Sequence, residues 1–213
     1  MRATEATIAV VDFEGTGAVP GYSNEPWQVG VVLLEAGEVR PGCAFESLLH
    51  VGDRPFNPHA PGRHTEVRDA MTCAPRLPDL WPELQPWISG RPLAAHGPAT
   101  EKRFLNDAFP LHPLGPWIDT VKLARMAYPH HARHTLERLL DDLSLTDAVA
   151  RIVPGRRPHD ALYDAAGCAV LLAHLLHLPQ WSGVSVDALT QARPVQYHRA
   201  RRATGTAPGS RQT

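Results

Sequence analysis

Residues 7–17 read TIAVVDFEGTG, an apolar run that ends in two acidic residues and a Gly-Thr-Gly break. The β-branched residues predict a buried strand over 7–13. Alternate residues of a strand share a face, so Asp12 and Glu14 would present two carboxylates side by side. A divalent cation such as Mg²⁺ or Mn²⁺ would neutralise their repulsion through oxygen ligands. Taken alone, the pair is as well explained by two solvated acids at an exposed strand end.

The segments around this strand predict an α/β domain with a mixed sheet. WQVGVVLL at 27–34 is typical of a second strand, and Ala36-Gly37-Glu38 is a plausible hairpin turn into a third strand near 43–51. Further along the chain, helical spacing alternates with short apolar strands, which is typical of this fold class. We expect strands at 92–96 and 117–121, and helices at 66–71, 77–88, 100–109 (capped by Thr100), 122–127, 134–143 and 160–177 (capped by Asp160).

A second candidate position is Glu101, which follows the short strand that ends at Ala95-His96. Ligands gather at strand ends in α/β sheets. An acidic residue in the first turn of a helix also complements the helix dipole, and that explanation is the better one for Glu101 alone.

The third candidate position is the segment that begins with His159 and Asp160. Asp164 is followed at helical spacing by Cys168, Leu171, Leu172 and Leu175, an apolar stripe that faces a core. A carboxylate on such a stripe is costly unless it is paired or binds a metal, which favours a functional role. Together the three positions supply four carboxylates and one histidine. Such a set can hold two divalent ions against a phosphodiester, with His159 accepting a proton from the attacking water.

Three segments resemble the motifs of the DnaQ-like 3′–5′ exonucleases of the DEDDh group, in the same order along the chain: VVDFEGTG, AAHGPATEKRFL and HDALYDAAGCAVLL. Weaker similarities, in GRHTEVRDAM, WIDTVKLAR and HTLERLLDDL, fill the gaps between them over roughly residues 7–177. The resemblance implies an RNase H-like fold with a central five-stranded mixed sheet flanked by helices.

The resemblance also implies roles for individual residues. Metal ligation falls to Asp12, Glu14 and Asp164, and His159 is the general base. The main chain and hydroxyl groups of Gly15, Thr16 and Gly17 would hold the terminal nucleotide. His96, in the second motif, is taken as a further substrate-binding residue.

The second motif departs from the family pattern. Glu101 stands where the family has aspartate, three residues before Phe104-Leu105, and Asp107 falls on the wrong side of that pair. Gly97 and Thr100 replace the usual asparagine and phenylalanine. Glutamate keeps the charge and is longer by one methylene, so we include Glu101 among the four metal ligands.

Composition excludes several classes of protein. Of 213 residues, 43% are hydrophobic and 20% charged, which is typical of a globular domain, and the net charge of −1 excludes a globally basic nucleic-acid coat. No apolar run approaches the roughly 20 residues that span a bilayer, so we expect no membrane partner. The three cysteines, Cys43, Cys73 and Cys168, form no pairing pattern, and we expect a cytoplasmic protein.

Arginines stand near the third motif and at the C-terminus. Arg151, Arg156 and Arg157 lie in a Pro-Gly loop, where phosphate contacts and a generic solvated basic loop are equally good explanations; we take Arg156 and Arg157 as candidate substrate-binding residues.

We expect an exonuclease domain over 1–180 and a largely disordered extension over 181–213.

The leading hypothesis is therefore a 3′–5′ exonuclease with two Mg²⁺ or Mn²⁺ ions per site. It would release nucleoside 5′-monophosphates from single-stranded or frayed 3′ ends, with DNA favoured over RNA. The alternative is a weakened or inactive module that binds nucleic acid or protein on the same fold, which the altered second motif motivates. We keep a polymerase, a repair factor and a second copy of the chain as candidate partners.

Overall fold

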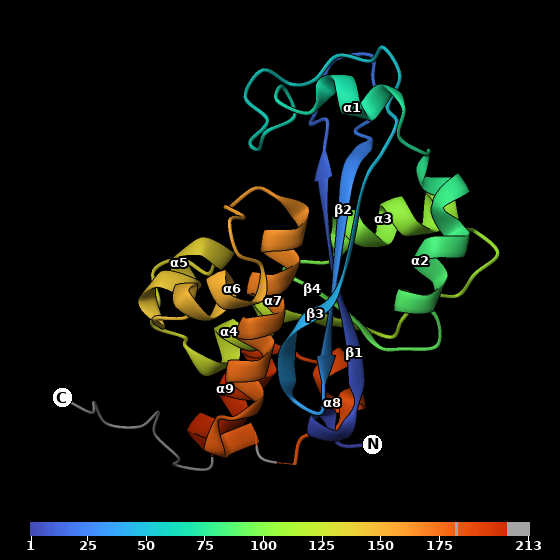
Figure 1. Ribbon diagram of the computed structural model, residues 1–213. Helices are drawn as coiled ribbons and strands as arrows, with labels where there is room; N and C mark the ends of the chain where they lie inside the picture. The colour runs from blue at the N-terminus through green and yellow to red at the C-terminus, as the bar shows by residue number, and fades with distance from the viewer. Residues whose placement is uncertain (182, 204–213) are drawn as a thin grey trace.

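The computed structural model describes residues 1–181 and 183–203, and its centre is a five-stranded sheet (Figure 1). The strand order is β3-β2-β1-β4-β5. The first three strands pair antiparallel, whereas β4 and β5 run parallel to β1. This arrangement confirms the expected mixed sheet of the RNase H-like fold. The strands are β1 (Thr7–Gly15), β2 (Pro26–Glu35), β3 (Glu38–Leu48), β4 (Leu93–Ala95) and β5 (Trp117–Asp119).

The alternation of side chains along β1 decides which face carries the acidic pair. Ile8 and Val10 belong to the apolar cluster on one side of the sheet, and Ala9, Val11 and Phe13 belong to the cluster on the other side. Because residues two apart share a face, Asp12 and Glu14 lie on the same face as Ile8 and Val10. That face is covered by the long helix α7 (Ala161–Leu176).

Helices cover both faces of the sheet. Figure 1 shows α4, α5, α6 and α7 on one side and α2 and α3 on the other. As expected, Asp160 caps α7, and its Oδ1 accepts a hydrogen bond from the Leu162 N–H at 3.1 Å. The remaining helices are α1 (Arg68–Thr72), α2 (Trp81–Ile88), α3 (Ala99–Ala108), α4 (Thr120–Ala127), α5 (Leu136–Asp142), α6 (Thr146–Ile152), α8 (Val186–Thr190) and α9 (Pro194–Ala203), with 3₁₀ turns at Ala3–Glu5, Leu77–Leu80 and Pro179–Trp181.

Several boundaries differ from those expected. The third strand begins at Glu38 rather than near residue 43, because Ala36 (φ 51°) and Gly37 (φ 80°) make a tight left-handed hairpin turn. Helix α3 begins at Ala99, and Thr100 therefore lies within the helix instead of capping it. Helix α6 was not expected, since its seven residues carry too little periodicity to be distinguished from loop.

The segment after residue 180 was expected to be a largely disordered tail, and its described part is not. Trp181, Val186, Leu189 and Ala192 are buried in the same apolar cluster as α7, and α9 extends the helical structure to Ala203. Four apolar side chains buried in the core hold this segment in place despite its weak periodicity. Residues 204–213 lie outside the described part of the chain, and the division into domains stays a prediction.

None of the helices in the described ranges is both long enough and apolar enough to cross a bilayer.

Candidate active site

Three chain segments bring acidic side chains to one edge of the sheet. Strands β1 and β4 are parallel neighbours, so their carboxyl ends lie at the same edge. Asp12 and Glu14 stand at the end of β1, and Glu101 stands in the first turn of α3, shortly after β4. Asp164 comes from the first turn of α7, which begins at this edge.

Two residues of β2 let α7 approach the acidic pair closely. Gly30 and Gln28 lie directly opposite Asp12 and Glu14 in the β1–β2 register. A Cβ on Gly30 would come within 2.3 Å of the Ala161 carbonyl oxygen, so only glycine admits the start of the helix. The buried Gln28 accepts a hydrogen bond from the Ala161 N–H through Oε1 at 3.2 Å. The first turn of α7 is thereby fixed beside Asp12 and Glu14.

Burial raises the pKa values of these carboxyl groups, and repulsion between them adds to the increase at Asp12 and Glu14. Glu14 is 8% exposed, and burial followed by repulsion from Asp164 raises its pKa to about 8. Glu101 is 7% exposed, and burial raises its pKa to about 7. The pKa of Asp12 lies well above its usual value because of burial and then repulsion from Asp164, Glu101 and Glu14. These couplings show that the four carboxylates converge.

Asp164 and His159 are joined through the backbone. The His159 N–H donates a hydrogen bond to Asp164 Oδ2 at 3.1 Å. Burial raises the pKa of Asp164 to about 6, although His159 opposes the increase. His159 Nε2 lies 3.1 Å from Glu137 Oε1 of α5, and both side chains are about half exposed. Sequence reasoning missed Glu137; its only signal was its place in the weakly similar segment HTLERLLDDL.

The cluster has the chemistry that a divalent cation requires. Ligand atoms of Glu14, His159 and Asp164 all lie within 4.8 Å of one another. The four clustered carboxylates are buried or partly buried, and Asp164 raises the pKa values of both Asp12 and Glu14. Such carboxylates gain free energy when a cation neutralises them, and oxygen-rich sites suit Mg²⁺ and Mn²⁺. The residues present therefore fit a metal site. By contrast, Asp107 is 69% exposed and pairs with Arg103, so it remains outside the cluster.

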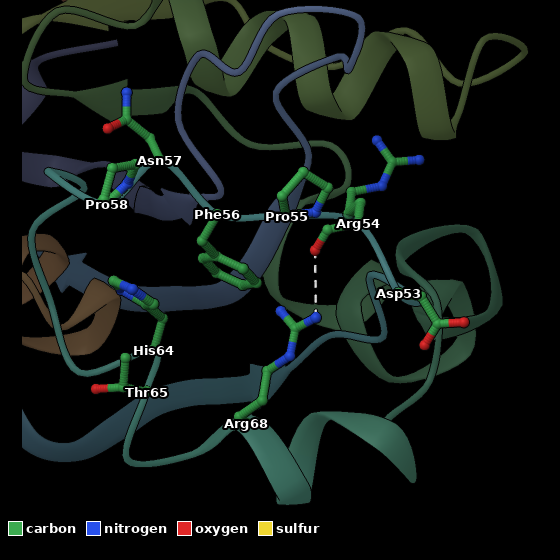
Figure 2. Close-up of a pocket in the computed structure, with 9 residues that line it drawn as sticks. All are labelled: Asp53, Arg54, Pro55, Phe56, Asn57, Pro58, His64, Thr65 and Arg68. Carbon is green, nitrogen blue, oxygen red and sulfur yellow. Dashed lines mark hydrogen bonds between the residues drawn. The ribbon is translucent and has the colours of Figure 1, made fainter.

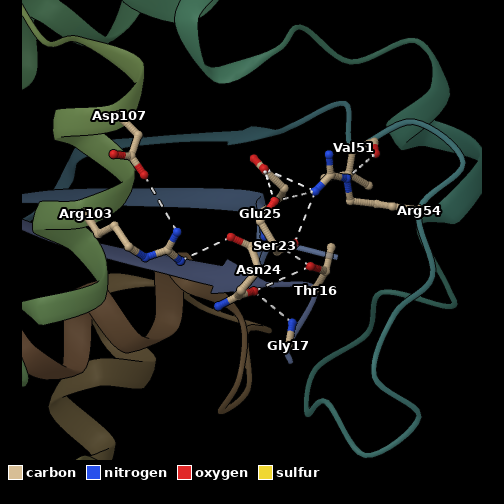
Figure 3. A network of polar contacts seen from close by, with 9 residues as sticks. All are labelled: Thr16, Gly17, Ser23, Asn24, Glu25, Val51, Arg54, Arg103 and Asp107. Carbon is tan, nitrogen blue, oxygen red and sulfur yellow. Dashed lines mark hydrogen bonds and ion pairs between the residues drawn. The ribbon is translucent and has the colours of Figure 1, made fainter. Parts of the chain in front are cut away.

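A polar network fixes the Gly-Thr-Gly turn that follows β1 (Figure 3). Asn24 Oδ1 accepts a hydrogen bond from the Gly17 N–H at 2.8 Å, and the buried Thr16 hydroxyl accepts one from the Glu25 N–H at 3.1 Å. A Cβ on Gly15 would come within 2.5 Å of Asn24 Oδ1. Arg103 of α3 donates to the Asn24 carbonyl oxygen at 3.1 Å, which joins this turn to the second motif. Neither Asn24 nor Arg103 carried a recognisable signal in the sequence.

Three residues that the sequence proposed for substrate binding have partners within the protein. His96 contacts Thr120 Oγ1 through Nδ1 at 2.9 Å and the His134 carbonyl oxygen through Nε2 at 2.8 Å. Arg156 binds Asp160 and Glu46, and Arg157 binds Glu66. Each would have to exchange one of these contacts to reach a substrate, and their binding roles stay predictions.

The loop between β3 and α1 lies beyond the end of β1 (Figure 1) and lines an open pocket of about 440 Å³ (Figure 2). Phe56 stands at its centre. The His64 ring stacks on Phe56 at 4.7 Å, and the Arg68 guanidinium lies 4.7 Å from the centroid of the same ring. Because the His64 ring and the Arg68 guanidinium both pack against the Phe56 ring, this cluster organises the loop rather than offering an open stacking surface.

The sequence profile of the RNase T exonuclease family matches residues 9–172. The chain belongs to this exonuclease family. The match covers most of the chain and all four clustered carboxylates, and it confirms the expected resemblance to the DnaQ-like exonucleases. Exonucleases of this family depend on divalent metal ions, in agreement with the acidic cluster.

Two curated relatives show the range of proteins that contain this exonuclease domain. The chain is 28% identical over 184 residues to the DNA polymerase III PolC-type of Bacillus cereus, covering 81% of this chain and 11% of the polymerase. It is 27% identical over 165 residues to exodeoxyribonuclease 10 of Escherichia coli K12, covering 76% of this chain and 70% of the relative. The chain thus spans only about a tenth of the length of the PolC-type polymerases.

A solved structure supports the same assignment. Exonuclease X in complex with 5′ overhanging duplex DNA aligns with a TM-score of 0.63 at 25% identity, covering 86% of this chain and 99% of that chain.

Proposed function

We propose that the protein is a metal-dependent 3′–5′ exonuclease that removes nucleoside 5′-monophosphates from single-stranded or frayed 3′ ends. The observation that carries the proposal is the convergence of Asp12, Glu14, Glu101 and Asp164 beside His159. A buried cluster of like charges costs folding free energy, so its presence at a strand edge favours a function that uses it.

In this proposal the four carboxylates hold two Mg²⁺ or Mn²⁺ ions. The ions, when bound, supply Lewis-acid activation of the attacking water and of the scissile phosphodiester. Glu137 Oε1 lies 3.1 Å from His159 Nε2, and with a proton held on that nitrogen, Nδ1 would accept the proton of the attacking water. The water oxygen would bond to phosphorus as the P–O3′ bond breaks, His159 would accept the proton that the water loses, and the leaving 3′-oxygen would take up a proton from solvent.

The proposed binding site of the terminal nucleotide is the turn at Gly15, Thr16 and Gly17. Asn24 holds this turn against β1, so its main chain keeps one conformation beside the cluster. A positive φ of 78° at Gly17, together with the 2.7 Å separation that a Cβ would have from Asn57 Cβ, requires glycine there.

We favour DNA as the substrate. One relative is named an exodeoxyribonuclease, and the aligned exonuclease X structure contains a duplex with a 5′ overhang. Such a duplex presents a recessed 3′ end, which supports attack from that end. The PolC-type relatives carry the matching segment within a DNA polymerase, and we therefore propose a polymerase or a repair factor as a partner.

The test is cleavage of 5′-labelled and 3′-labelled oligonucleotides of DNA and of RNA, with Mg²⁺, Mn²⁺ or EDTA. We expect metal-dependent release of 3′-terminal mononucleotides, which Asp12→Asn abolishes. The matched control is Asp107→Asn, which removes an exposed carboxylate from α3 and should leave the rate unchanged. Absence of turnover on all substrates by folded protein that binds Mn²⁺ would favour the alternative, a non-catalytic binding module.

A further inference from the structure

Asp160 is a buried carboxylate outside the four-carboxylate cluster, and two arginines bind it. Its side chain is 2% exposed. Arg63 Nη2 lies 3.1 Å from Asp160 Oδ2, and Arg156 Nη1 lies 3.0 Å from the same oxygen. Its other oxygen, Oδ1, caps α7 through the Leu162 N–H. Both oxygens of this carboxylate therefore already have partners within the protein.

These contacts join three separate parts of the fold. Arg63 comes from the loop between β3 and α1, and Arg156 comes from the loop before α7. Arg156 also binds Glu46 of β3. Replacement of a buried ion pair by apolar residues is often neutral or stabilising, so such a pair is better explained by the specificity of the arrangement that it imposes than by stability.

The arrangement that Asp160 imposes includes the conformation of His159. The backbone of His159 has a φ of 61°, in the left-handed region that residues other than glycine seldom adopt. Its N–H is held by Asp164. On its other side, a Cβ on Gly62 would lie 2.8 Å from the His159 carbonyl oxygen, so the loop that carries Arg63 packs directly against this turn. The backbone of His159 is thus held at its amide, its carbonyl and the following residue.

We propose that Arg63 is a positioning residue for the reaction: by binding Asp160 it keeps the loop against the left-handed turn that presents His159 to the carboxylate cluster. The inference rests on the proposed function, in which His159 accepts the proton of water. Among the described residues, Asp160 supplies the ion pair of Arg63, whose Nε is buried without a partner. Substitution of Arg63 therefore removes one defined contact.

The fold should survive this substitution, because Arg156 still neutralises Asp160. The chain also offers a matched control, since Glu66 and Arg157 form a second ion pair between the same two segments. Both side chains of that pair are more than half exposed, and neither is among the partners of Asp160, so Glu66→Gln breaks a bridge between the segments without removing a contact of Asp160.

The experiment compares wild type, Arg63→Ala, Arg63→Lys and Glu66→Gln under steady-state conditions on a 5′-labelled oligonucleotide. We expect Arg63→Ala to lower kcat by about 10- to 100-fold, the cost of a misplaced reacting group, with KM nearly unchanged. Lysine restores the charge and should recover part of the loss, and Glu66→Gln should keep the wild-type kcat. An unchanged kcat in Arg63→Ala, or an equal loss in Glu66→Gln, would overturn the proposal.

A second measurement does not depend on turnover. The imidazole Cε1–H signal of His159, assigned by its disappearance in His159→Gln, should shift in Arg63→Ala and remain in place in Glu66→Gln. If wild type shows no cleavage while the signal behaves in this way, the proposed function fails and the positioning of His159 by Arg63 stands. If cleavage is normal and the signal does not move in folded Arg63→Ala, the positioning proposal fails by itself.

Discussion

Replacement of Glu14 by glutamine should stabilise the metal-free protein at alkaline pH. Burial and the neighbouring carboxylates raise the pKa of Glu14 from 4.5 to about 8. Between these values the folded protein retains a proton that the unfolded chain has released. The free energy of unfolding therefore falls as the pH rises through this window and levels off above it. Glutamine is neutral throughout, so the variant lacks this contribution.

The size of the effect follows from the change in pKa. A rise from 4.5 to about 8 corresponds to roughly 5 kcal/mol once the carboxyl group is ionised. Part of this free-energy cost is relieved when water enters the metal-free site and the side chain moves. We therefore expect Glu14→Gln to raise the free energy of unfolding by about 2–3 kcal/mol above the pH window. For a chain of this length that is a rise in Tm of roughly 4–12 °C.

The assay is thermal and urea unfolding of EDTA-treated protein at several pH values on either side of the window, followed by titration with Mg²⁺. Wild type should lose stability as the pH rises and regain it with Mg²⁺, whereas Glu14→Gln should show a flatter pH profile and little response to the metal. Asp107→Asn, at an exposed carboxyl group, is the control for a simple change in net charge. Equal stability of wild type and Glu14→Gln across the window would refute the electrostatic account of the site.

Four further substitutions probe the geometry. Gly30→Ala should destabilise the fold by about 1–3 kcal/mol in urea unfolding, because its Cβ would collide with the Ala161 main chain. In Gly167→Ala the Cβ would meet the side chains of Leu140 and Leu136, with Leu140 Cδ1 nearest at 2.9 Å. Because these are flexible side chains rather than main chain, the variant should remain within about 1 kcal/mol of wild type. Glu101→Asp should lower kcat by about 10- to 100-fold because the shorter carboxylate is withdrawn from the cluster; a faster variant would show that Glu101 is a handicap. His159→Gln should lose about 10²- to 10⁴-fold in kcat while keeping its Mn²⁺ affinity, and weaker binding in calorimetry would make His159 a ligand instead of the base.

The strands and the acidic positions could be recognised in the sequence because both depend on local patterns. Alternation along β1 places Asp12 and Glu14 on one face whatever the remaining fold is, and the apolar stripe of α7 marks Asp164 as an unusual carboxylate. Short elements were harder to predict. Helix α6 and the segment around Trp181 and Leu189 are stabilised by packing against the core. Local hydrophobic periodicity does not reveal such packing.

The contacts that hold the site together could not be read from the sequence. The sequence left Arg156 between a phosphate contact and a generic basic loop. Its contacts with Asp160 and with Glu46, the latter 110 residues away along the chain, could not be predicted from local pattern. Glu137 and Arg63 lie in segments with only weak similarity to the family, and the sequence does not show that α5 and the β3–α1 loop bring them to His159 and Asp160.

The sequence by itself determined the mixed α/β sheet and marked four carboxylates and a histidine as candidates for the site, because hydrophobic periodicity and motif spacing are properties of short segments. Only the tertiary structure decided which charges meet. Charge–charge contacts act through space over a few ångströms, and the segments involved are brought within that range by the parallel alignment of β1 with β4 and by the close approach of α7 over Gly30.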